Sequence, residues 1–118
     1  MPDFNTIDEV VEDLQNGRMI VLVDKRETDI DGRETVGEGE LMMLAGLASA
    51  DAINFMMRHA GNPPVITASK NHFEALELHL MVPGAQGPRG ASIGISVNAR
   101  HIPGTGVSAQ DRALTIHK

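Results

Sequence analysis

The residues best suited to binding an anion lie near the carboxyl end of the 118-residue chain, in the stretch 104–116, GTGVSAQDRALTI. Ser108, followed three residues later by Asp111, has the spacing of a capping box, so we expect a helix to begin directly after it. A helix N-terminus offers free N–H groups and the positive end of its dipole, which attract phosphate or carboxylate. Thr105 and Ser108 would add hydroxyl donors, and Arg112 would add a guanidinium. An ordinary capped surface helix is the alternative interpretation.

A second candidate is the acidic stretch 24–40, which begins at Asp24 after an apolar run. It contains seven carboxylates, three basic residues and three glycines, and its net charge is −4. Carboxylate oxygens are the ligands that magnesium prefers. Crowded carboxylates also raise one another's pKa, which suits general acid–base catalysis. A solvated loop whose charges serve solubility is the alternative.

The five histidines form no recognised zinc-binding pattern. His101 is the strongest catalytic candidate among them, because it follows Arg100 and precedes the glycine-containing stretch 104–106. A surface histidine without a catalytic role is the alternative.

Composition narrows the possible partners. The chain carries a net charge of −6 and has three Phe but no Trp or Tyr, which argues against nucleic-acid binding and against an anionic membrane surface. It has no Cys, which excludes disulfides and thiolate chemistry. No apolar run approaches the ~20 residues that span a bilayer, and the first residues do not resemble a signal peptide. We therefore expect a cytoplasmic protein.

Capping signals and apolar periodicity predict elements that would hold these candidates in place. Thr6 and Glu9 predict a helix that ends near Gly17. Ser49 and Ser69 predict two more helices, the first extending to about His59. Short runs typical of strands lie near 19–24, 64–68 and 93–98. This alternation predicts one α+β domain over residues 1–118, with a mixed β-sheet and packed helices.

Several motifs resemble the 3,4-dihydroxy-2-butanone 4-phosphate synthase family of the riboflavin pathway. The strongest is TGVSAQDRALTI at 105–116, which is similar to that family's Thr-Gly-Ile/Val-Ser-Ala-Ala-Asp-Arg signature. ISVNA at 95–99 resembles the strand that precedes this signature in the family. VEDLQNGRMIVLVD at 11–24 resembles the family's first helix and strand, and AINFMMRHA at 52–60 resembles its second helix. The resemblance implies the family's fold, magnesium dependence, a homodimer, and conversion of ribulose 5-phosphate to the butanone phosphate and formate.

The resemblance also implies roles for individual residues. The family's acidic motif Arg-Glu-Asn-Glu-Gly-Asp would correspond, with a small insertion, to RETVGEGE at 33–40. Glu34 would bind the metal and act in catalysis. Glu38 and Glu40 would match the later acids of the motif, and Asp24 the start of the acidic run, so Glu38 and Asp24 are further catalytic candidates. His101 stays a catalytic candidate because of its position in the sequence alone. The implied residues for binding a small anionic substrate are Arg33, Thr105, Ser108, Asp111 and Arg112.

Two departures from the family pattern keep a second hypothesis open. Val65 stands near the place where the family usually has a Cys. The family's Gly-His-Thr-Glu motif, which carries the second metal ligand, has no counterpart up to Lys118. We therefore expect weak or no synthase activity from the isolated chain. A divergent lyase that enolises its substrate is the first hypothesis, and a non-catalytic binding or assembly module is the second.

Overall fold

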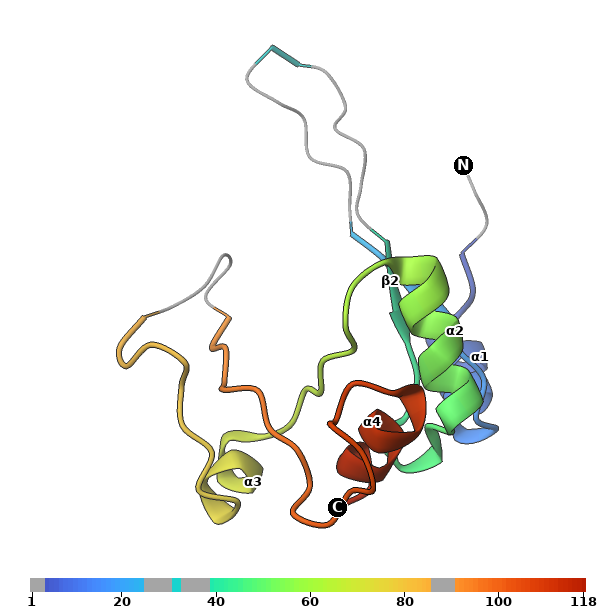
Figure 1. Ribbon diagram of the computed structural model, residues 1–118. Coiled ribbons are helices and arrows are strands. Elements are labelled where there is room, and N and C mark those ends of the chain that lie inside the picture. Colours follow the sequence, from blue (N-terminus) through green and yellow to red (C-terminus); the bar gives the residue numbers. More distant parts are fainter. Residues whose placement is uncertain (1–3, 25–30, 33–38, 86–90) are drawn as a thin grey trace.

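The computed structural model describes residues 4–24, 31–32, 39–85 and 91–118. Helix α1 spans Ile7–Gln15 and leads into an antiparallel pair of strands, β1 (Ile20–Val23) and β2 (Gly39–Met42). A short 3-10 helix, η1 (Ala45–Leu47), precedes α2 (Ala50–Ala60), and α3 (Lys70–Ala75) and α4 (Ala109–Ile116) follow. Figure 1 shows α2 lying alongside β2, with α4 next to α2 and α3 on a separate part of the chain. Helices with a small antiparallel sheet confirm the predicted α+β class.

The helices begin where their capping residues predict. At α1, the Thr6 hydroxyl accepts the Glu9 N–H at 3.3 Å, and the Glu9 carboxylate accepts the Thr6 N–H at 2.8 Å. Ser49 and Ser69 cap α2 and α3 through single bonds from the amides of Ala52 and His72. These caps satisfy N–H groups that have no partner inside a helix.

Two of the three predicted strands are absent from the described structure. Residues 64–68 belong to no helix or strand. The segment 93–98 contains a single bridge, between Leu80 and Gly94. The strand predicted near 19–24 is confirmed as β1, which pairs with β2. Ile20 lies opposite Met42 at one end of this ladder, and Val23 lies opposite Gly39 at the other. A β-type sequence becomes a strand only when a neighbour supplies a ladder, and Pro64 has no N–H to contribute to one.

The buried core is small and lies where α2 meets α4. Ile53 on α2 is 1% exposed, and it clusters with Ala48 and with Ala113 of α4. Partly buried apolar side chains surround this cluster: Met43, Ala50, Met56, Met57, Ala109 and Ile116. The core therefore fixes the axis of α4, which is the helix that carries the predicted anion-binding residues.

Much apolar surface of the described residues remains exposed. It includes all three of Val21, Leu22 and Val23 on β1, and the extended segment that contains Ile93, Ile95 and Val97. Patches of this kind commonly mark surfaces that contact another polypeptide. No described helix is long and apolar enough to cross a bilayer.

Candidate functional site

The loop before α4 folds back onto the helix through Asp111. This residue is 3% exposed, and its Oδ2 accepts the Gly106 N–H at 3.0 Å. The sequence predicted a capping box in which Asp111 would reach back to Ser108. One half of that prediction is confirmed, since the Ser108 hydroxyl accepts the Asp111 N–H at 3.0 Å. The Asp111 carboxylate instead bonds to Gly106, so it holds the loop rather than the cap.

Two glycines allow this close approach. A Cβ at Gly104 would collide with the Asp111 carboxylate, and a Cβ at Gly106 would collide with the Asn98 side chain. Gly106 also has a φ of +85°, a conformation that residues with a Cβ rarely adopt. The Gly-Thr-Gly sequence is therefore explained by packing against Asp111 and Asn98.

A second hydrogen bond, from the Ala99 N–H to Thr115, joins α4 to the start of the same loop. The Thr115 hydroxyl accepts the Ala99 N–H at 3.2 Å and donates to the Asp111 carbonyl oxygen at 3.0 Å. Thr115 lies one helical turn after Asp111, so the two side chains share one face of α4. Neither Thr115 nor Asn98 was among the site residues predicted from the sequence. The four-residue spacing from Asp111 was the available signal for Thr115.

Arg112 occupies a different side of α4 and is only partly buried. Its Nε donates to the Val107 carbonyl oxygen at 2.9 Å, which directs the guanidinium toward the first turn of the helix. The Ala109 and Gln110 amides of that turn donate no hydrogen bond within the described part of the chain. The Ser108 hydroxyl oxygen accepts in the cap, and its hydrogen has no acceptor among the residues that the structure describes. The start of α4 thus carries several hydrogen-bond donors that have no acceptor within the described ranges.

The structure thus gathers four predicted substrate-binding residues, Thr105, Ser108, Asp111 and Arg112, within one loop and one helical turn. His101 lies in an exposed turn of the same loop, and Asp24 is exposed directly after β1. Arg33, Glu34 and Glu38 lie outside the described residues, so their roles remain predictions. Within the described ranges, no three His, Asp or Glu side chains come close enough together to hold a metal ion. The predicted magnesium site therefore depends on Glu34 and its neighbours.

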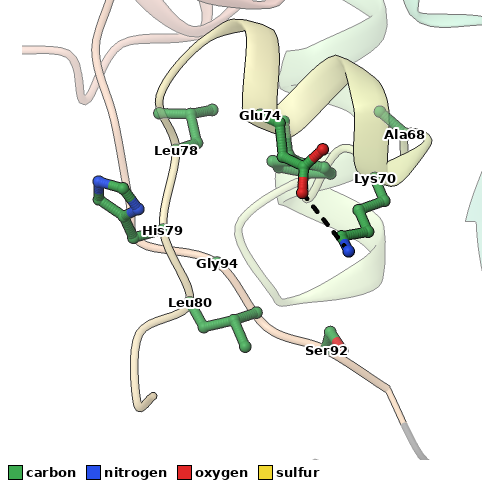
Figure 2. A pocket seen from close by; sticks show the side chains of 9 residues that line it. Ala68, Lys70, Glu74, Leu78, His79, Leu80, Ser92 and Gly94 are labelled. Carbon is green, nitrogen blue, oxygen red and sulfur yellow. Dashed lines mark ion pairs between the residues drawn. The ribbon is translucent and has the colours of Figure 1, made fainter. Parts of the chain in front are cut away.

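A separate pocket of about 360 Å³ lies between α3 and the segments 78–80 and 92–94. Figure 2 shows His79 and Leu80 pointing to opposite sides of their segment, with Ser92 across the pocket. Lys70 and Glu74 pair with each other at 3.5 Å, so their opposite charges offset one another. None of the predicted site residues that the structure describes lines this pocket.

Comparisons with known proteins agree with the motif at α4. Residues 8–118 match the family model of 3,4-dihydroxy-2-butanone 4-phosphate synthase. The chain belongs to this family. The synthase of Pseudomonas aeruginosa is 35% identical over 112 residues, which are 95% of this chain and 29% of that protein. The riboflavin biosynthesis protein RibBA of Aquifex aeolicus is 36% identical over 115 residues, 96% of this chain and 27% of that protein.

Solved structures of the synthase family share the fold. A synthase in complex with two magnesium ions superposes with a TM-score of 0.74 at 28% identity, over 97% of this chain and 50% of that chain. A two-domain synthase from A. baumannii gives the same TM-score at 33% identity, over 95% of this chain and 31% of that chain. This chain therefore spans between about a quarter and a half of the length of these relatives.

Proposed function

We propose that this chain forms the anion-binding part of a divergent butanone phosphate synthase, a lyase that enolises a small phosphorylated polyol ketone such as ribulose 5-phosphate. Family membership supports the reaction class. The observation that carries the proposal is the folded start of α4, where available N–H and hydroxyl donors lie beside the Arg112 guanidinium. Donors of this kind are what a phosphate group requires.

The buried Asp111 carboxylate must be weighed against this proposal, since a negative charge near the first turn of a helix competes with an anion. Two observations support its compatibility with a bound phosphate. The carboxylate is 3% exposed and accepts the Gly106 N–H on the inner side of the loop. Arg112, the next residue along, supplies a compensating positive charge nearer to solvent. The phosphate would bind on the solvent side, between Arg112 and the amides of Ala109 and Gln110.

Enolisation needs a base that removes a proton from the carbon next to the substrate carbonyl. We assign this step to the acidic stretch, with Glu34 or Glu38 as the base and Asp24 and His101 as accessory groups. Magnesium is the metal we expect, with Glu34 as a ligand. One solved relative, in complex with two magnesium ions, supports a metal in the family. The phosphate end would be bound by α4, and the ketone end would face the acidic stretch.

Binding of ribulose 5-phosphate, measured by calorimetry or NMR titration, tests the proposal. Arg112→Ala should weaken binding by about 1.5–3 kcal/mol, the usual loss for a charged hydrogen bond. Arg112→Lys should recover only part of this, because it keeps the charge but loses the planar fork of donors. Arg18→Ala is the matched control, since Arg18 pairs with Asp13 at 2.8 Å between α1 and β1. Equal binding by the Arg112→Ala and Arg18→Ala proteins would refute the proposal.

A non-catalytic binding module is the second candidate function. The departure at Val65, where the family usually has a Cys, favours it. Release of formate from ribulose 5-phosphate separates the two candidates. Binding that depends on Arg112 without formate release supports the module, and binding with formate release supports the lyase.

A further inference from the structure

We infer that Thr115 is a positioning residue for the anion-binding loop, an inference that rests on the proposed function of α4. Residues 99–106 include the predicted site residues His101 and Thr105. Two side chains on one face of α4 hold this segment, since Thr115 bonds to the Ala99 amide and Asp111 bonds to the Gly106 amide. The loop is therefore tied to the helix at both of its ends.

The Thr115 hydroxyl group both donates and accepts a hydrogen bond. The single hydroxyl hydrogen goes to the Asp111 carbonyl oxygen at 3.0 Å, and the oxygen accepts the Ala99 N–H at 3.2 Å. A hydroxyl that donates and accepts in this way has one favoured orientation, so it transmits the position of the helix to the backbone at Ala99. Both bonds are partly buried, which reduces competition from water.

The other contact at this end of the loop is weaker. The Asn98 side-chain amide donates to the Thr105 carbonyl oxygen at 3.5 Å, the outer limit for a hydrogen bond, and Asn98 is exposed. The start of the loop therefore depends mainly on Thr115. Without its hydroxyl group, Ala99 would lose its partner, and residues 100–105 could shift relative to Arg112. Thr115 would then affect phosphate binding without touching the phosphate.

The test compares three variants in titrations with inorganic phosphate followed by NMR. Thr115→Val keeps the shape but removes the hydroxyl group, and we expect the dissociation constant to rise about threefold to tenfold, the range for one neutral hydrogen bond. Thr115→Ser keeps the hydroxyl group and should restore affinity close to that of the parent. Thr67→Val is the matched control, on the exposed extended segment between α2 and α3, and should bind as the parent does.

A direct measurement accompanies the affinities. The Ala99 amide should exchange slowly with solvent in the parent and in Thr115→Ser. An Ala99 amide in the parent that exchanges at the rate of an unstructured peptide would overturn the inference, and this holds even if Thr115→Val does not fold. Thr115→Val that binds phosphate as tightly as the parent would also overturn it. A parent that binds no phosphate would instead refute the proposed function, while slow exchange at Ala99 would still support the tie between loop and helix.

Discussion

Gly104 offers the sharpest test of how the loop packs on α4. The change Gly104→Ala adds one methyl group, and that group would collide with the Asp111 carboxylate. The backbone of Gly104 does not adopt the left-handed conformation, so alanine introduces no intrinsic strain there. Any loss of stability should therefore come from the contact with Asp111.

The size of the loss follows from the bond that must break. To make room for the methyl group, the Asp111 carboxylate must move away from the Gly106 N–H, which it now accepts at 3.0 Å. A hydrogen bond to a charged group contributes about 1.5–3 kcal/mol. Replacing glycine by alanine also lowers the conformational entropy of the unfolded chain, which raises the free energy of unfolding by about 0.4–1 kcal/mol. The free energy of unfolding should fall by roughly 0.5–2.6 kcal/mol.

A double-mutant cycle measured by urea denaturation isolates this contact. In an Asp111→Ala background the added methyl group meets no carboxylate, so Gly104→Ala should become neutral or slightly stabilising. Gly46→Ala is the control, because a Cβ at Gly46 meets no atom within 4 Å and its φ is also not left-handed. If Gly104→Ala lowers the free energy of unfolding equally in both backgrounds, or by no more than Gly46→Ala does, then Gly104 does not act through its contact with Asp111.

Three further predictions concern the rest of the molecule. Ile53→Ala should lower the free energy of unfolding by about 2–5 kcal/mol, because Ile53 is buried between α2 and α4. In the same denaturation experiment, the control Val65→Ala should change it by less than about 0.5 kcal/mol, because Val65 is exposed. The Thr6 backbone N–H, and then its hydroxyl group, hold the pKa of Glu9 below its ordinary value of 4.5, so the contribution of this cap to stability should be complete above that pH and lost as the pH falls through the lowered pKa. An NMR titration of Glu9 with a midpoint at or above 4.5 would contradict this. We also propose a homodimer that covers exposed apolar residues such as those on β1, and light scattering should give about twice 12.7 kDa at micromolar concentration; a 12.7 kDa species would count against it.

Sequence reasoning located the helices well because their starts depend on residues three positions apart. Thr6, Ser49, Ser69 and Ser108 all cap the helices that follow them, as predicted. The strands near 64–68 and 93–98 were predicted wrongly because pairing depends on distant segments. The run at 93–97 alternates like a strand, but its partner at 79–81 supplies only a short contact around Leu80 and Gly94.

At the candidate site, too, contacts between near neighbours in the sequence were predictable, and contacts that depend on loop packing were not. The position of Ser108 as the cap was predictable, but the bonding of Asp111 was not. An aspartate at this position of a helix can reach back to the capping residue or into the preceding loop, and the choice here follows from the space left by Gly104 and Gly106. The roles predicted for Glu34 and Glu38 concern residues outside the described structure and stay predictions.

Asp111 and Arg112 have different surroundings because neighbouring helical residues point about 100° apart. Asp111 faces inward, 3% exposed, and bonds to the loop, while Arg112 lies partly exposed beside the available donors of the first turn. Their charges cancel, so an approaching phosphate would meet oriented donors without a net negative charge. The loop and the proposed binding surface should therefore be interdependent, because a change that frees the Asp111 carboxylate would place its charge closer to a bound phosphate. We therefore expect Gly104→Ala to weaken phosphate binding as well as stability, although Gly104 contributes no side chain to the site.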